Sequence, residues 1–395
     1  MISEKMYGLG SKRSAIRELF EYGKMRAGIV GKENVYDFSI GNPTVPSPLC
    51  VKESIMEILE TVNSSEIHGY TSAQGDLETR AVIADYLNKT YGLHVTADNF
   101  YMTCGAAASL CITLKAIVED SSDEVIAIAP FFPEYKVFAE AQGATFRLVP
   151  PDTKEFQINF EALADTINVH TKAVIINSPN NPSGTIYSAE TITKLATLLN
   201  KRSEEYGHPI ILICDEPYRE IAYDDVEVPY VTKYYNDTVV CYSYSKSLSL
   251  PGERIGYILV PNEMTDSKQM YAAVCGAGRA LGYVCAPSLM QKVIAKCQGQ
   301  TGDIDLYKKN RDLLYQNLTN MGYHCVKPQG AFYLFMEALE SDANAFCERA
   351  KQYDLLIVSG DDFGCPGYVR ISYCVEEDMI KRSFKAFEKL AASYQ

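Results

Sequence analysis

The chain contains no tryptophan and only five histidines among its 395 residues. No apolar stretch approaches the roughly 20 residues that a membrane-spanning helix needs. Residues 1–14, MISEKMYGLGSKRS, also lack the apolar core of a secretory signal. We therefore expect a cytoplasmic protein without a membrane partner, in which any aromatic side chain that binds a flat ligand is phenylalanine or tyrosine.

Positive charge is scarce as well. Lysine and arginine number 37 against 50 aspartates and glutamates, which gives a net charge of −13, and the basic residues form no run. An acidic surface repels nucleic acid and anionic membranes, so we expect neither as a partner. The twelve cysteines are scattered, without a C-x-x-C pair or a His/Cys cluster at zinc spacing. We expect reduced core thiols and no metal site.

The middle of the chain alternates short apolar runs with helical patterns. The helical patterns include residues 133–142 and 188–203. Strands are predicted at residues 125–129, 144–149, 172–177, 210–215, 238–243 and 254–260. Fully apolar strands that alternate with helices are typical of a buried, mostly parallel sheet. The fold class is therefore α/β.

The two ends of the chain have a different pattern. A helix is predicted around residues 12–27, before the Gly/Pro-rich stretch IGNPTVPSP. Beyond residue 286 the pattern predicts a helix near 303–321, strands at 331–335 and 368–373, and a last helix from about 376. We predict a large α/β domain over 48–285 and a smaller α+β domain built from 1–47 and 286–395.

Open α/β sheets bind their ligands at the carboxyl ends of the strands, and several distinctive stretches follow predicted strands. In YMTCGAAASL (101–110), the backbone N–H groups of Ala106 and Ala107 open a helix and suit a phosphate, although tight packing also explains small residues there. In APFFPEY (129–135), Phe132 either stacks on a ring or packs in the core. In NSPNNPSGT (177–185), Asn181 can donate to a ligand oxygen, and its bond to Pro182 is a candidate for the cis form.

Two further stretches carry ionisable groups. Asp215 ends the apolar strand of ILICDEPY, so this carboxylate either needs a cationic partner or caps a helix, and Tyr218 can face the same cleft. In SYSKSLSLPGERIGY (243–257), a desolvated Lys246 beside a cation would have a lowered pKa and act as a nucleophile. Its neighbours Ser243, Ser245 and Arg254 supply donors for a phosphate.

Together these stretches provide a carbonyl-reactive amine, a phosphate cradle, a ring stacker and a buried acid, which are the groups that pyridoxal 5'-phosphate requires. The order and spacing of NNPSG, of DEPY, of SYSK with Arg254 eight residues later, and of YVRIS resemble the fold-type I PLP-dependent aminotransferases of class I/II, the aspartate aminotransferase superfamily. The resemblance runs from about Asp37 to the end of the chain. It implies the fold of that family, with pyridoxal phosphate as cofactor.

The resemblance assigns roles to individual residues. Lys246 would form the Schiff base and then move the proton between the substrate Cα and the cofactor C4′. Asp215 would pair with the pyridinium nitrogen, while Asn181 and Tyr218 would bind the phenolic oxygen and Phe132 would stack on the ring. The phosphate would be held by Ala106, Ala107, Ser243, Ser245 and Arg254.

The same resemblance implies residues for the substrate and for a second subunit. Arg370, in YVRIS, would clamp the substrate α-carboxylate with help from Asn181 and the backbone N–H of Gly41. Tyr70, in HGYTSAQGDLETR, would reach the phosphate of the neighbouring subunit, which implies a homodimer with shared active sites.

The chain departs from the family pattern in PGERIGY, which replaces the commoner T-G-W-R-x-G, and in a phosphate turn, CGAAAS, without hydroxyl or lysine side chains before its final serine. We predict an aminotransferase that moves an amino group between an L-amino acid and a 2-oxo acid. The alternatives are a β-carbon–sulfur lyase or other amino-acid lyase, a decarboxylase, or a PLP-binding regulator. A dicarboxylate substrate would need a second cation, for which Arg279, Lys12 and Arg13 are candidates.

Overall fold

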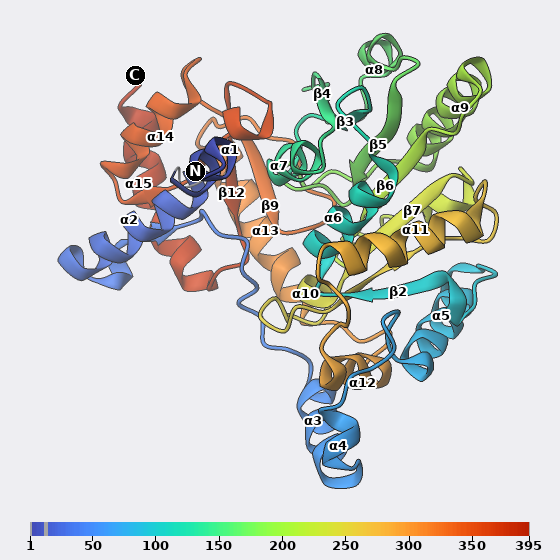
Figure 1. The fold of residues 1–395 in the computed structure, drawn as a ribbon. Coiled ribbons are helices and arrows are strands. Elements are labelled where there is room, and N and C mark those ends of the chain that lie inside the picture. The colour runs from blue at the N-terminus through green and yellow to red at the C-terminus, as the bar shows by residue number, and fades with distance from the viewer. Residues whose placement is uncertain (1, 12–14, 395) are drawn as a thin grey trace.

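A seven-stranded sheet forms the centre of the molecule in the computed structural model, which describes residues 2–11 and 15–394 (Figure 1). Its strands lie in the order β2-β8-β7-β6-β5-β3-β4. Strand β8 is antiparallel to both of its neighbours, and the other pairs are parallel, so the expected mostly parallel sheet is confirmed. The strands span Phe100–Thr103 (β2), Glu124–Ile128 (β3), Thr145–Val149 (β4), Thr171–Asn177 (β5), Ile211–Asp215 (β6), Thr238–Ser243 (β7) and Gly256–Leu259 (β8).

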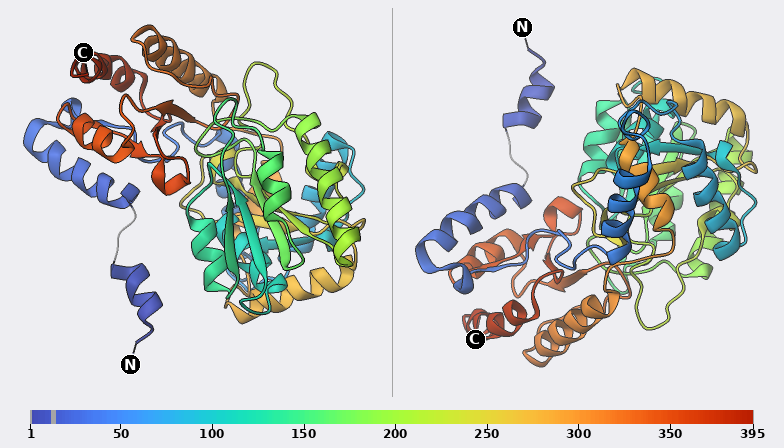
Figure 2. Two further views of the ribbon diagram at one scale, coloured as in Figure 1. Left: turned by 90° about the horizontal axis from the view of Figure 1, so that it is seen from above. Right: turned by 90° about the horizontal axis from the view of Figure 1, so that it is seen from below.

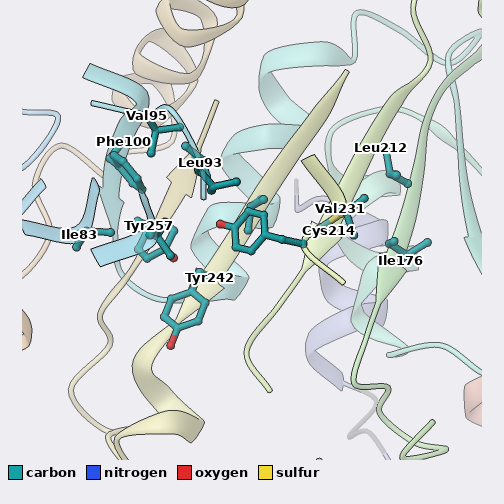
Figure 3. Close-up of a cluster of buried hydrophobic side chains, with 14 of the residues drawn as sticks. Ile83, Leu93, Val95, Phe100, Ile176, Leu212, Cys214, Val231, Tyr242 and Tyr257 are labelled. Atoms are coloured by element: carbon teal, nitrogen blue, oxygen red, sulfur yellow. The ribbon is translucent and has the colours of Figure 1, made fainter. Parts of the chain in front are cut away.

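Successive side chains of these strands pack into hydrophobic clusters on opposite faces of the sheet. Because both faces are covered, the strands have continuous apolar sequences. In β6, Leu212 and Cys214 join the cluster shown in Figure 3, whereas Ile213 packs with α6 and α7 on the other face. The helices of this part are Leu49–Thr61 (α3), Ser64–Ile67 (α4), Leu77–Tyr91 (α5), Ala106–Ile117 (α6), Glu134–Ala141 (α7), Phe160–Thr166 (α8), Ala189–Tyr206 (α9), Tyr244–Ser247 (α10), Ser267–Ala280 (α11) and Ser288–Lys296 (α12).

The two chain ends lie together beside this sheet, as the blue and red elements of Figure 2 show. This part of the chain contains an antiparallel sheet of order β11-β12-β9 and a separate short parallel pair, β1–β10. These strands span Tyr36–Asp37 (β1), Tyr333–Glu337 (β9), Leu355–Leu356 (β10), Val358–Ser359 (β11) and Tyr368–Ser372 (β12). The helices span Glu4–Ser11 (α1), Ala15–Val30 (α2), Ile304–Asn320 (α13), Ala343–Lys351 (α14) and Glu377–Ala392 (α15).

The helix expected around 12–27 corresponds to α2, although residues 12–14 lie outside the described residues. The division into 48–285 and the two chain ends remains a proposal. The boundary at residue 285 would separate α12 from α3 and α5. Met290 and Val293 of α12 belong to the same buried cluster as residues of those two helices. A boundary between α12 and α13 follows the packing better. Within residues 2–11 and 15–394, no helix has both the length and the apolar character that crossing a membrane requires.

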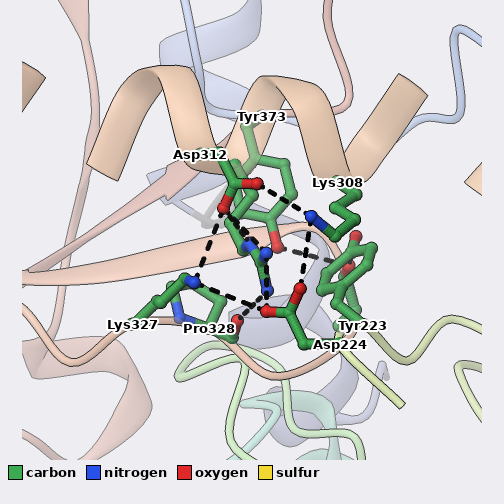
Figure 4. A network of polar contacts seen from close by, with 9 residues as sticks. Tyr223, Asp224, Lys308, Asp312, Lys327, Pro328 and Tyr373 are labelled. Carbon is green, nitrogen blue, oxygen red and sulfur yellow. Dashed lines mark hydrogen bonds and ion pairs between the residues drawn. The ribbon is translucent and has the colours of Figure 1, made fainter. Parts of the chain in front are cut away.

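A network of charged side chains joins α13 to the turn after Tyr223 (Figure 4). The guanidinium of Arg311 is buried, and its Nη2 lies 2.8 Å from Asp224 Oδ2 and 2.7 Å from Asp312 Oδ1. Lys308 and Lys327 approach the same two carboxylates. Partial burial alone would raise the pKa of Asp224, but hydrogen bonds from Lys308 and Arg311 lower that pKa to about 2. The network compensates the desolvated charge of Arg311 where the two parts of the chain meet.

We predict that Asp224→Asn lowers the free energy of unfolding by about 2 kcal/mol, because Arg311 loses a charge-assisted partner. Asparagine tolerates the positive φ of 57° at this position. Asp225→Asn is the matched control, since Asp225 is exposed with a φ of 58°. Urea denaturation at pH 7 measures the difference. Because the folded pKa of Asp224 is depressed, the difference should shrink as the pH falls from about 4 towards 2. Equal losses in the two variants would contradict this prediction.

Candidate active site

A cavity of about 290 Å³ lies at the carboxyl ends of β5, β6 and β7. Larger hollows of about 540 and 790 Å³ lie elsewhere, and we assign the site by the chemistry of its lining rather than by size. With the exception of Tyr70, the predicted site residues all line this cavity: Gly41, Ala106, Ala107, Phe132, Asn181, Asp215, Tyr218, Ser243, Ser245, Lys246, Arg254 and Arg370. Residues far apart in the sequence thus meet at one edge of the sheet.

Lys246 lies in the single-turn helix α10, directly after β7. Ser243 caps this turn, and its Oγ accepts a hydrogen bond from the backbone N–H of Ser245 at 3.1 Å. The Lys246 Nζ donates to the carbonyl oxygen of Gly41 at 2.7 Å. Burial, together with the charges of Arg370 and Arg254, lowers the pKa of Lys246 to about 8. A larger fraction of this amine is therefore neutral and nucleophilic near neutral pH than for an exposed lysine.

Asp215 is buried at the end of β6 with its two carboxylate oxygens in different situations. Oδ2 accepts a hydrogen bond from the hydroxyl of Tyr135 at 2.5 Å, whereas Oδ1 is buried and has no partner within residues 2–11 and 15–394. Burial raises the pKa of Asp215 to about 7, although the hydrogen bond from Tyr135 opposes this effect. A buried carboxylate oxygen without a donor is costly, so Oδ1 suits a cationic N–H group of a ligand.

The loop after β5 connects Asp215 to Arg370. Asn177 donates from Nδ2 to the backbone oxygen of Asp215 at 2.8 Å and accepts at Oδ1 from the backbone N–H of Asn181 at 2.7 Å. Asn181 Oδ1 in turn accepts from Arg370 Nη1 at 3.0 Å. The Asn181–Pro182 peptide bond is cis, as the sequence indicated. This loop therefore fixes the acid and the arginine relative to each other.

Arg370 is buried on β12, from the smaller sheet. Its Nη2 donates to the carbonyl oxygen of Ser39 at 2.6 Å, and its buried Nε has no partner in the part of the chain that the structure describes. The guanidinium carbon lies 4.7 Å from the ring centre of Tyr333 and 5.0 Å from that of Phe363. Burial lowers the pKa of Arg370, yet a guanidinium stays charged at physiological pH. Arg370 therefore presents a partly satisfied cation that suits a carboxylate.

The other end of the cavity has the character of an anion site. The backbone N–H groups of Ala106 and Ala107 lie in the first turn of α6, after Gly105 with a φ of 90°. A Cβ on Gly105 would lie 2.8 Å from Arg254 Nη2, so only glycine leaves room for this guanidinium. The Oγ atoms of Ser243 and Ser245 lie 2.6 Å apart beside it.

The unusual PGER turn has a defined role at this end. Arg254 Nη1 donates to the carbonyl oxygen of Pro251 at 2.9 Å and lies 3.5 Å from Ser245 Oγ. The Arg254 backbone has a φ of 52°, in the left-handed region. The PGER segment thus forms a turn in which Arg254 is directed toward the serines.

Sequence reasoning missed several residues of the cavity. Asn177 and Tyr333 line it, and Tyr333 in AFYLF was read only as part of a strand. Tyr135 lies behind the lining, where it bonds Asp215, and its place three residues after Phe132 in APFFPEY could have marked it. Tyr70 is 99% exposed and lies outside the cavity of its own chain. Arg279 is exposed on α11 and is not part of the cavity lining, and Lys12 and Arg13 lie outside the described residues.

We predict that Asp215 titrates near pH 7 in the ligand-free protein and that Tyr135→Phe moves this midpoint higher, because the variant loses the donor that stabilises the carboxylate. Infrared titration of the carboxyl C=O band, taken as the difference from Asp215→Asn, measures both midpoints. A midpoint near the ordinary aspartate value would show that burial does not raise the pKa of Asp215. An unchanged midpoint in Tyr135→Phe would show that the Tyr135 hydroxyl does not lower this pKa.

Comparisons with known proteins agree with the fold and with the chemistry of the cavity. The family model "Aminotransferase class I and II" matches residues 33–387. The probable aspartate aminotransferase of Methanocaldococcus jannaschii is 28% identical over 99% of this chain and 100% of that protein.

Solved structures agree as well. A crystal structure of an amino transferase from Eubacterium rectale is 66% identical, with a TM-score of 0.99 over 100% of this chain and 99% of that one. The aspartate aminotransferase of Thermotoga maritima superimposes with a TM-score of 0.87 at 27% identity, over 98% and 99% of the two chains. The lyase alternative is not favoured. The chain belongs to the class I and II aminotransferase family, has the fold type I architecture, and is an aminotransferase.

Proposed function

We propose that the protein uses pyridoxal 5'-phosphate to move an amino group between an L-amino acid and a 2-oxo acid. The observation that carries this proposal is the meeting, in one cavity, of the desolvated amine of Lys246 with a buried Asp215 oxygen that has no partner among the described residues. Relatives are named for aspartate and aromatic amino acids, which share an α-amino acid group, and for prephenate, which is a 2-oxo acid. We therefore propose this class of substrate and not a particular side chain.

The residues of the cavity fit the cofactor. Asp215 Oδ1 would accept from the protonated ring nitrogen, and the unpaired acceptor explains why such a ligand is favourable there. Asn181 and Tyr218 would bind the phenolic oxygen, and Phe132 would cover a ring face. The phosphate would be held by the N–H groups of Ala106 and Ala107 and by Ser243, Ser245 and Arg254. When bound, the cofactor supplies a carbonyl carbon for amines and a ring that delocalises the electrons left at the substrate Cα.

The residues of the chain would then perform the remaining tasks. Arg370, with the Gly41 N–H and Asn181, would bind the α-carboxylate and so present the Cα hydrogen towards Lys246. The lowered pKa of Lys246 makes its Nζ a base near neutral pH, able to take the proton from Cα and return it to the cofactor C4′. Asp215 would keep the ring nitrogen protonated throughout. Asn181, Asp215 and Arg370 are buried, which strengthens their electrostatic contacts.

We further propose a homodimer. Tyr70, Leu77 and Val284 are large apolar or aromatic side chains with exposed fractions of 99%, 62% and 48%. The hydrogen bond from Cys285 Sγ to the carbonyl oxygen of Thr71, at 3.5 Å, brings these segments together. An exposed patch of this kind supports pairing with a second copy, which would insert Tyr70 into its partner's phosphate site. All twelve cysteines are free thiols, which suits the cytoplasmic location that we propose.

The central test is Lys246→Ala. We expect at least a thousandfold loss of amino transfer with an unchanged circular dichroism spectrum, because the variant lacks both the amine that binds the cofactor and the base. Formation of a new 2-oxo acid from pairs of amino acids and 2-oxo acids, followed by chromatography, measures the rate. Lys268→Ala, at an exposed lysine of α11, is the control. Transfer by Lys246→Ala at the wild-type rate would refute the proposal.

The shared site has a separate test. The wild-type protein should sediment with twice the mass of one chain, and Tyr70→Phe should bind pyridoxal phosphate about tenfold more weakly, because a hydrogen bond to a charged phosphate is lost. Tyr283→Phe, in the same exposed region, should leave this affinity unchanged. A monomer in sedimentation, or equal affinities in all three proteins, would exclude the shared arrangement.

A further inference from the structure

Tyr333 occupies a central position in the cavity that no sequence motif assigned to it. It lies on β9, in the smaller sheet, and is almost completely buried. It contacts three groups with different proposed tasks: Tyr218, which faces the phenolic oxygen of the cofactor, Arg370, which binds the carboxylate of the substrate, and Gly41, which lies beside Lys246.

The contact with Tyr218 is a hydrogen bond between two buried phenols, with 2.9 Å between the hydroxyl oxygens. Arg370 lies close to Tyr333, and a nearby cation favours the loss of a phenolic proton. Burial raises the pKa of both phenols, and Arg370 opposes this rise at both. Because the guanidinium of Arg370 lies against the ring of Tyr333, we assign Tyr333 as the donor of the pair. With Tyr333 donating, the Tyr218 proton is left to point into the cavity.

The contact with Arg370 is made by the ring. The guanidinium carbon lies 4.7 Å from the ring centre of Tyr333, a distance at which the ring attracts the cation. Arg370 keeps an unpartnered buried Nε, so the ring and the two oxygen acceptors, Ser39 O and Asn181 Oδ1, define where the guanidinium sits. Movement of Arg370 on binding a carboxylate would act directly on Tyr333.

The contact with Gly41 is steric. A Cβ placed on Gly41 would lie 1.9 Å from the Tyr333 hydroxyl oxygen and 2.7 Å from its Cζ, so a side chain there is incompatible with the position of Tyr333. The carbonyl oxygen of the same glycine accepts from Lys246 Nζ. One tyrosine therefore touches two of the three groups proposed for the substrate carboxylate, Arg370 and Gly41, and also the phenol proposed to face the cofactor.

We propose that Tyr333 is a positioning residue that orients the Tyr218 hydroxyl toward the phenolic oxygen of the cofactor and couples this orientation to the binding of the substrate carboxylate by Arg370. The inference rests on the proposed function and extends it to a residue that acts through its neighbours. Hydrogen bonds in such a chain strengthen one another, so loss of the Tyr333 hydroxyl should weaken the bond that Tyr218 makes.

The test uses the loaded protein and the pH at which the absorbance of the bound cofactor changes. Tyr333→Phe keeps the ring and removes the hydroxyl, and it should raise the midpoint of this change by about half a unit to one unit, since the negative phenolic oxygen is less well stabilised. Tyr218→Phe should raise it at least as much. The double variant should match Tyr218→Phe alone, because Tyr333 acts through Tyr218.

Two further variants distinguish the effect of the Tyr333 hydroxyl from the effect of its ring and from general effects on packing. Tyr333→Leu removes the ring beneath Arg370 and should raise KM for the amino donor about tenfold, whereas Tyr333→Phe should change KM little. Tyr307→Phe is the matched control, because the buried Tyr307 hydroxyl has no partner in the part of the chain that the structure describes and its ring packs on Phe332, next to Tyr333. It should leave the midpoint and KM unchanged.

The outcomes are distinct. An unchanged midpoint in Tyr333→Phe, or shifts of Tyr333→Phe and Tyr218→Phe that add in the double variant, would overturn the role of Tyr333 and leave the proposed function intact. If Tyr333→Phe folds poorly by circular dichroism, Gly41→Ala displaces the same hydroxyl and should give the same rise, and an unchanged midpoint there would also overturn the inference. A wild-type protein that binds no pyridoxal phosphate would overturn the proposed function and this inference together.

Discussion

The site depends on the burial of charged groups at one edge of a sheet. Lys246, Asp215 and Arg370 are largely withdrawn from water, and among the described residues Asp215 and Arg370 each keep a buried polar atom without a partner. Desolvation of this kind destabilises an empty protein, and it becomes useful when a ligand supplies the missing charges and donors. Hydrogen bonds of Asp215 with Tyr135, of Lys246 with Gly41 and of Arg370 with Ser39 satisfy part of each group and so determine which atom remains available.

The groups proposed for the site come from two cores and must keep fixed positions relative to one another. Asp215 ends a strand of the large sheet and Lys246 follows another of its strands, while Arg370 and Tyr333 belong to the small sheet. The loop after β5 joins them within the cavity, and the charged network around Arg311 joins the same two parts farther away. Rigid sheets thus supply the side chains, and a few polar contacts set the spacing between the sheets.

Much of this arrangement could be predicted from the sequence, because buried parallel strands have continuous apolar runs and because Lys246, Asp215 and Arg254 occur in an ordered series of motifs. Contacts between distant residues could not. Tyr218 and Tyr333 are 115 positions apart, and Tyr135 and Asp215 are 80 apart, so neither pair leaves a local pattern. The antiparallel direction of β8 and the packing of α12 on α3 and α5 were missed for the same reason.

The single turn of α10 has a consequence for how the lysine moves. A lysine that holds a cofactor and later acts as a free base has to leave its position and return to it many times. The backbone of Lys246 is fastened by the strand before it, by the cap of Ser243 and by the buried Leu248 after it. The Nζ atom of Lys246 can therefore change position mainly by rotation about the bonds of its flexible four-carbon side chain.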